Sequence, residues 1–222
     1  MTKQTQVLEA PVFHEPDDFS ACLAPLTPDD MSFDDVPGLG GQDMIFFLFK
    51  ELQKKLTSVQ KDDVSLKYYL DECGVSDLMA GDFQTFFDAH FTPGRTNVTS
   101  LRDIYETAYA LFSQDEYAQA VGFFSLIASL EGNIAGSLLA LSACANRQAL
   151  YRSGYDLAVA SIKANEKHPR SYLLAGYCAL QLKEQKSAKR YLALAARLAR
   201  KDPAYRTEQR AAQRKLLLLQ FS

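Results

Sequence analysis

The chain has 222 residues, of which 47% are hydrophobic and 23% charged, and its formal net charge is −3. These proportions are typical of a soluble globular protein with one or two domains, and they exclude a fibre or a wholly disordered chain. Neither a disulfide framework nor a metal site is expected, because the histidines stand far apart and the cysteines form no C-x-x-C pair. Reduced thiols predict a cytoplasmic protein, with cysteines at Cys22, Cys73, Cys144 and Cys178.

The two ends of the chain carry opposite charge. Between Met1 and Asp43, nine acidic residues and five prolines accompany a single lysine, which predicts a disordered acidic tail over residues 1–42. This start also lacks the basic and apolar stretches of a secretory signal, and no apolar run is long enough to cross a bilayer. Between Lys183 and Lys215, eleven basic residues face three acidic ones. We interpret this stripe as a solvated helix face and not a nucleic-acid site, because the bases lie on a helical pattern whose other face is the apolar "YLALAARLA" and the whole chain is mildly acidic.

Residues 43–98 predict a helical region. The stretch "DMIFFLFKELQKKLTSVQ" repeats apolar residues at helical spacing and adds rings at Phe46 and Phe47. Such a wide apolar face suits a helix covered on two sides, by its own chain or by a second subunit. A second helical stretch is expected from Val64 to His90, with breaks near Gly74 and Gly81 and a loop after it.

A regular period of about 34 residues begins at Leu101. Tyr117 and Tyr151 are one period apart, and Ala120, Gly154 and Ala188 recur at the same interval. This is the spacing of tetratricopeptide repeats, in which small residues let the two helices of each repeat touch. We therefore predict an all-α fold in which residues 99–222 form three such repeats and a carboxy-terminal capping helix.

The second repeat is the weakest match to this period. It has Ala158 where the other repeats have the larger Phe124 and Leu192. A rival register, in which Tyr155 takes the role of Tyr117, would need one extra helical turn before it. We favour the unbroken period.

The first helix of each repeat is expected to line an inner wall able to bind an extended peptide. The alternative is that this wall packs against an amino-terminal helix of the same chain. The wall tyrosines Tyr105, Tyr109 and Tyr177 favour ligand binding slightly over this alternative, because tyrosine hydroxyls prefer a wet edge. Gly136 falls on this wall, and the candidate peptide-binding residues are Arg102, Tyr105, Tyr109, Phe112, Leu139, Ala143, Asn146, Arg170, Leu173, Tyr177 and Leu180.

The repeat region resembles the class II chaperones of bacterial type III secretion. The resemblance rests on "IY" with "AY" four residues later, "ALSACANRQ" and "HPRSYLLAGYCALQ", and covers about Leu101 to Leu198. It implies a cytoplasmic chaperone that binds an extended segment of a hydrophobic translocator protein in the inner groove, on Tyr105, Tyr109, Phe112 and the wall of the next two repeats. It also implies that Leu66–His90 corresponds to a segment used in self-association, hence a homodimer. Residues before about Val64 have no counterpart.

Catalysis is disfavoured, because the sequence has no glycine-rich phosphate loop, no G-x-S-x-G and no H-E-x-x-H. We expect no enzyme activity, no cofactor, no metal and no nucleic-acid partner. Two functional classes remain. One is an export chaperone that masks apolar segments of its cargo before secretion. The other is a repeat scaffold or regulatory adaptor that binds a peptide of a folded partner.

Overall fold

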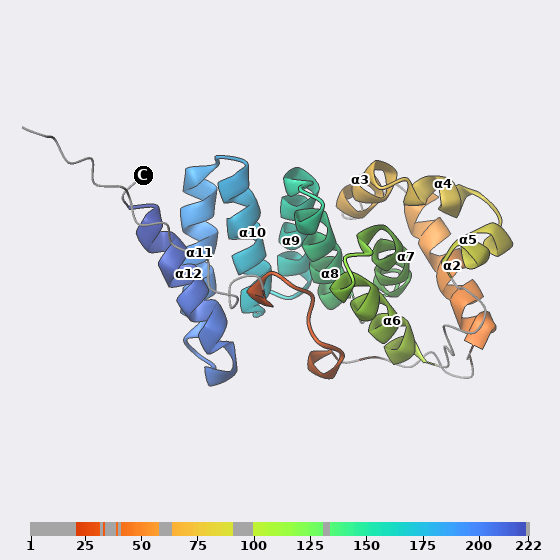
Figure 1. Cartoon of the computed structure of the whole chain (residues 1–222), viewed down its shortest axis with the longest axis horizontal. Coiled ribbons are helices and arrows are strands. Elements are labelled where there is room, and N and C mark those ends of the chain that lie inside the picture. The colour runs from red at the N-terminus through yellow and green to blue at the C-terminus, as the bar shows by residue number, and fades with distance from the viewer. Residues whose placement is uncertain are drawn as a thin grey trace, which may run out of the picture.

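The computed structural model describes residues 21–31, 33, 39, 41–57, 64–90, 100–130 and 134–220. Within these residues the regular structure is entirely helical, as predicted, and the helices follow one another in an elongated stack (Figure 1). In chain order the elements are η1 (Pro28–Asp30), α2 (Gly41–Thr57), α3 (Val64–Glu72), α4 (Val75–Ala80), α5 (Phe83–His90), α6 (Leu101–Ser113), α7 (Tyr117–Ala128), α8 (Ile134–Arg147), α9 (Tyr151–Ala164), α10 (Pro169–Gln181), α11 (Gln185–Ala199), η3 (Pro203–Tyr205) and α12 (Arg206–Leu218).

The same helix-turn-helix unit occurs three times, as α6–α7, α8–α9 and α10–α11. The second helices begin at Tyr117, Tyr151 and Gln185, which are equally spaced along the sequence. Each is preceded by a left-handed residue that ends the first helix, and these residues are Asp115, Ala149 and Lys183, with φ of 62°, 59° and 62°. The identical turns confirm the unbroken period. The rival register is wrong, because the second helix of the middle repeat begins at Tyr151 and not at Tyr155.

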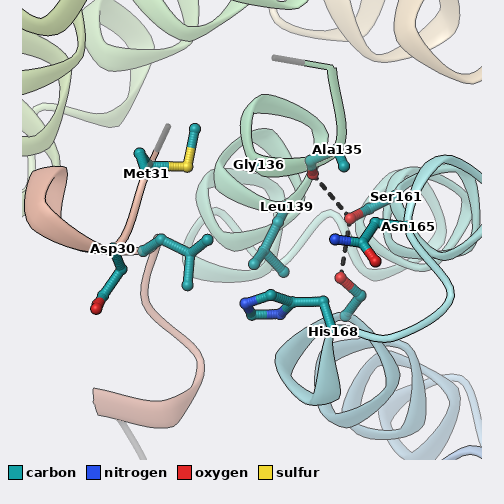
Figure 2. Close-up of a pocket in the computed structure, with 10 residues that line it drawn as sticks. Asp30, Met31, Ala135, Gly136, Leu139, Ser161, Asn165 and His168 are labelled. Carbon is teal, nitrogen blue, oxygen red and sulfur yellow. Dashed lines mark hydrogen bonds between the residues drawn. The ribbon is translucent and has the colours of Figure 1, made fainter. Parts of the chain in front are cut away.

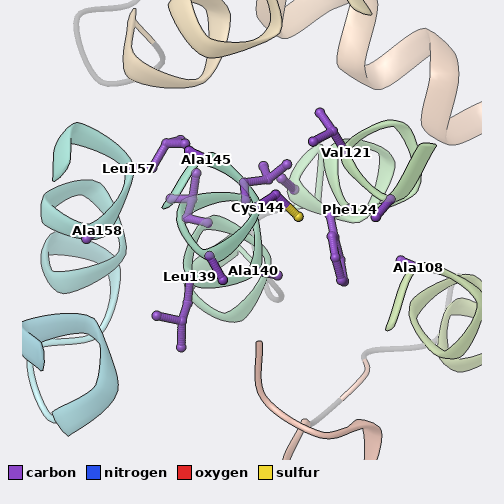
Figure 3. Close-up of a cluster of buried hydrophobic side chains, with 14 of the residues drawn as sticks. Ala108, Val121, Phe124, Leu139, Ala140, Cys144, Ala145, Leu157 and Ala158 are labelled. Atoms are coloured by element: carbon purple, nitrogen blue, oxygen red, sulfur yellow. The ribbon is translucent and has the colours of Figure 1, made fainter. Parts of the chain in front are cut away.

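Small residues let the paired helices approach closely, as the pattern predicts. In the middle repeat the Ser142 hydroxyl donates to the carbonyl of Gly154 across 2.6 Å. In the third repeat, a Cβ placed on Gly176 would lie 2.8 Å from Cγ of Leu192. The side chains between successive helices form one continuous apolar core, part of which is drawn in Figure 3. Ala158, the weak match, is fully buried in it.

The amino-terminal helices pack against the second helices of the repeats. Helices α2 and α5 contact α7, and α3 contacts α9. The phenylalanines of α2 lie edge-on to those of α5, with ring centroids of Phe46 and Phe83 5.0 Å apart. The sequence predicts that α2 is covered on two sides, and the helices that cover it belong to this chain, although the Phe46 side chain remains 45% exposed. Leu66, Tyr69 and Leu70, within the predicted self-association segment, are buried in the body of the same chain.

Residues 21–31 are packed, which corrects the prediction that the whole of 1–42 is a disordered tail. Cys22, Leu23 and Leu26 are buried in the common core, and the short 3-10 turn η1 contacts α6. Together with Pro25, which is also buried, these side chains supply an apolar burial that the overall acidic composition does not reveal. We call residues 21–31 the docked segment. Residues 1–20 of the predicted tail lie outside the described residues.

At the other end, α12 packs against α11 and closes the stack, as expected of a capping helix. At the start of η3, which precedes α12, the Asp202 side chain accepts a hydrogen bond from the backbone N–H of Ala204. No helix in the described part of the chain is long and apolar enough to cross a membrane.

The close helix contact in the first repeat gives a test of the fold. Ala120 of α7 is fully buried, so Ala120→Leu should lower the free energy of unfolding by about 1 to 3 kcal/mol through overpacking. The control is Ala118→Leu, because Ala118 lies on the same helix and is exposed. Urea unfolding of both variants measures the difference. Equal stabilities would contradict the close contact.

Candidate functional site

The first helices α6, α8 and α10 form one side of the repeat stack, which we call the first-helix face. The docked segment lies along this face (Figure 1, red). Its contacts with α6 and α8 and the cavity that it shares with α10 define the candidate site.

Tyr105 of the first repeat is the central contact of the docked segment. Its side chain is fully buried, and its hydroxyl donates to the carbonyl of Leu26 across 2.9 Å. Its ring lies edge-on to Phe33 and to Phe124, with centroid distances of 5.5 and 5.2 Å. Burial raises the pKa of Tyr105 well above its usual value. The hydroxyl expected at a wet edge is therefore satisfied by a backbone carbonyl of the same chain.

The other predicted residues of the first repeat divide between two places. Arg102 is exposed and pairs with Asp29 of the docked segment and with Glu106 of its own helix. Tyr109 is half-buried against the core. Phe112 instead packs edge-on against Tyr117, at 5.3 Å, with the Arg147 guanidinium over its ring. Phe112 thus lies by the turn of its repeat, in contact with the ring that the sequence assigns to the scaffold.

In the second repeat, the docked segment approaches the backbone of α8. A Cβ on Gly136 would lie 2.4 Å from the Met31 sulfur, so a larger residue there would require the flexible end of the Met31 side chain to move. Leu139 is buried and lines a cavity of about 190 Å³ between the segment and α10. Ala143 is buried deeper in the core, and Asn146 is half-buried at the far end of the helix.

Figure 2 shows the polar side of this cavity. The Ser161 hydroxyl donates to the carbonyl of Ala135 across 2.8 Å and lies 2.9 Å from the hydroxyl of Ser171. His168 at the start of α10 faces Leu139 across the cavity. The docked segment therefore leaves part of the first-helix face unfilled.

In the third repeat, Arg170 is engaged in a buried ion pair. Its Nε lies 2.6 Å from Oε1 of Glu208 on α12, and the Glu208 side chain is only 2% exposed. This pair joins the last repeat to the capping helix. Leu173 is fully buried and Leu180 is half-buried. Tyr177 is also half-buried, with the Lys215 ammonium 5.7 Å from its ring centroid.

Three buried polar atoms near this face have no hydrogen-bond partner among the described residues. They are Oδ1 of Asn146, Nδ1 of His168 and Oε2 of Glu208. Burial and then the charge of Arg170 lower the pKa of His168 to about 4, which keeps the imidazole neutral near pH 7. The amide oxygen and the carboxylate oxygen accept, and Nδ1 of the neutral imidazole accepts or donates according to the tautomer, so these atoms have unused hydrogen-bonding capacity.

Sequence reasoning missed His168, Ser161 and the docked segment. The signal for the segment is the run "CLAPL", Cys22 to Leu26, whose apolar residues interrupt an otherwise acidic tail. His168 gave a weaker signal, since a lone histidine before Pro169 reads as an ordinary helix start. In the described part of the chain, no three metal-ligating side chains gather. No disulfide joins any two of the four cysteines, all of which lie in the described part of the chain.

No protein-family model and no curated protein sequence matches the chain. Several solved structures share its fold. PcrH from Pseudomonas aeruginosa is 22% identical with a TM-score of 0.53, covering 54% of this chain and 91% of PcrH. PcrH in complex with the chaperone binding region of PopD gives 22% identity and a TM-score of 0.52, covering 54% and 90%. The type III secretion translocator chaperone SycD of Yersinia enterocolitica gives 22% and 0.52, covering 55% and 83%.

These likenesses establish the architecture. The chain has the tetratricopeptide-repeat fold of PcrH and SycD, which confirms the fold expected from the resemblance in the repeat region. Each match covers little more than half of this chain, although it covers most of the solved protein.

The ion pair between α10 and α12 gives a second prediction. Arg170→Met leaves the Glu208 carboxylate buried without its partner, and should lower the free energy of unfolding by about 3 to 5 kcal/mol. Arg152→Met is the control, because it breaks the exposed pair with Glu184 at 3.3 Å and should cost no more than about 1 kcal/mol. Urea unfolding measures both. Equal losses would show that the Arg170–Glu208 pair behaves as a surface pair.

His168 gives a prediction on pH. The unfolded chain takes up a proton on this residue below about pH 6.5, whereas the folded chain does so only near pH 4. The wild type should therefore lose stability across this window because of His168. Relative to wild type, His168→Gln should gain about 1 to 3 kcal/mol as the pH falls from 7 to 4. Urea unfolding at a series of pH values measures this gain, and parallel curves for the two proteins would contradict it.

Proposed function

We propose that this protein is a chaperone of type III secretion that binds an extended segment of a hydrophobic translocator protein on its first-helix face before export. One observation carries the proposal. The first-helix face of this fold already holds an irregular segment of polypeptide, the docked segment, whose Leu26 carbonyl accepts a hydrogen bond from the buried Tyr105 hydroxyl. The fold is shared with PcrH, which has been solved with the chaperone binding region of PopD.

The chemistry of the face suits an extended peptide. Leu139, Tyr109 and Leu180 offer apolar surface for spaced side chains. The Tyr105 hydroxyl donates to a backbone carbonyl, and Arg102 meets a carboxylate. The unpartnered acceptors described above can receive backbone N–H groups. Backbone hydrogen bonds would fix the register of a bound peptide and the apolar surface would select its side chains.

The proposed mechanism is binding alone. A translocator carries long apolar segments, which associate prematurely when they are exposed in water. Covering one such segment lowers the concentration of free, association-prone chain, and release needs only a competing partner in the secretion apparatus.

The partner is tested by purifying the tagged full-length chain from its source bacterium and identifying bound proteins by mass spectrometry. We expect a protein with long apolar segments, encoded with secretion components, that becomes soluble when co-expressed with this chain. A soluble, folded partner would instead support the adaptor function. A translocator that stays insoluble in co-expression would overturn the chaperone proposal.

A substitution on the first-helix face tests the location. Tyr109→Ala removes a half-buried ring of α6, and should weaken binding of the co-purified translocator at least about fivefold. Tyr68→Ala is the matched control, because Tyr68 is 59% exposed on α3, away from the first helices. Isothermal calorimetry measures both affinities. Equal affinities would place the binding surface elsewhere.

A further inference from the structure

We propose that the docked segment is a built-in competitor for the first-helix face: it occupies the face when the chain is empty, and the translocator must displace it. This inference rests on the proposed function and adds a means of regulating the same site. It concerns residues 21–31 as an internal ligand of the folded repeats.

The contacts of the docked segment are those of a bound peptide. Its backbone accepts a hydrogen bond from Tyr105 through the carbonyl of Leu26, and its Asp29 pairs with Arg102. Further along, Met31 lies against Gly136 of the second repeat. The backbone at Thr27 and Met31 is extended, on either side of the short turn η1. Predicted peptide-binding residues are thus engaged by the chain itself.

The covalent connection makes this docking effective. Only nine residues separate Met31 from Gly41, where α2 begins, and α2 is packed against the repeats through α7. A short tether holds the segment near the face at a high effective concentration. Even a weak contact is therefore enough to keep the face occupied.

The docked segment is nevertheless held on the first-helix face by few contacts. The buried apolar side chains of the segment are Cys22, Leu23, Pro25 and Leu26, and their burial opposes the entropy lost in ordering about ten residues. The pair between Asp29 and Arg102 is exposed and adds little. Leu26 and Met31 leave a cavity open beside His168, whose Nδ1 has no partner within the described residues. A longer peptide that fills the cavity and supplies N–H donors would bind better than the segment.

Cys22 reports directly on docking. Its side chain is 2% exposed when the segment is in place. Cys144 and Cys178 lie in the repeat core, where burial raises the pKa of both thiols, to about 12 for Cys178. Because Cys73 is only half-buried, the experiment uses the full-length chain with Cys73→Ser. In this background, the rate of alkylation by iodoacetamide measures release of the segment.

Three full-length variants are compared with the parent chain, which should be alkylated slowly at Cys22. Leu26→Asp places a charge at a buried position of the segment, and should raise the rate at least tenfold. Ala21→Asp adds the same charge at an exposed position next to Cys22, and should leave the rate near that of the parent. Asp29→Lys reverses an exposed charge that faces Arg102 and leaves the buried core unchanged. It should raise the alkylation rate of Cys22 less than Leu26→Asp does. Protection of Cys22 in both Leu26→Asp and Asp29→Lys would overturn the proposal.

A peptide in trans tests competition. The probe is a synthetic peptide of residues 21–33 with serine in place of Cys22, and the control is the same composition in scrambled order. The probe should raise Cys22 alkylation of the parent chain in a saturable way, whereas the scrambled peptide should not. No effect of the probe would contradict a shared site. Protection that increases with protein concentration would show docking between two copies, and would overturn an internal competitor.

The translocator found by co-purification separates this inference from the proposed function. It should bind Leu26→Asp severalfold more tightly than the parent chain, because less of the face is occupied, and should expose Cys22 of the parent on binding. Equal affinities for both proteins would overturn the competitor and leave the chaperone function standing. Binding to neither protein would overturn the proposed function, while the alkylation and peptide results would still decide whether the segment docks.

Discussion

The close approach of two helices within each repeat is the constraint on which the rest of this structure depends. A Cβ on Gly154 would lie 3.4 Å from the carbonyl oxygen of Ser142, and one on Gly176 would lie 2.8 Å from Cγ of Leu192, in each case on the other helix of the same repeat. Where the helices touch, the same left-handed turn closes each pair, and the pairs then stack at a fixed interval. The first helices consequently fall on one side of the stack and the second helices on the other.

This separation gives the two sides different neighbours. The second helices α7 and α9 receive the amino-terminal helices α2, α5 and α3, which bury a cluster of phenylalanines. The first helices receive a short irregular segment with few buried side chains. A face covered by packed helices cannot be uncovered without disrupting the fold, whereas a face covered by a short irregular segment can release that segment and bind another peptide. The difference in what covers them is the physical reason to look for binding on the first-helix face.

The repeats could be predicted from sequence because local spacing determines them. Ala120, Gly154 and Ala188 recur at equal intervals, and the structure buries each of them at a helix contact. The site was predicted less completely. The wall positions Arg102, Tyr105 and Gly136 do meet a peptide, but the peptide belongs to this chain, and Leu139 lines the cavity beside it. Phe112 and Arg170 follow the same spacing, yet neighbouring elements engage them, through Tyr117 and Glu208.

The sequence by itself determined the helical class, the repeat period and the positions of its turns, because these follow from interactions within a single repeat. Only the tertiary structure decided what covers each face. The contact between Tyr105 and Leu26 joins residues 79 positions apart, and no local pattern encodes such a pairing. The acidic composition of residues 1–42 predicted disorder, whereas the burial of Cys22, Leu23 and Leu26 against a face built much later in the chain outweighed it for residues 21–31.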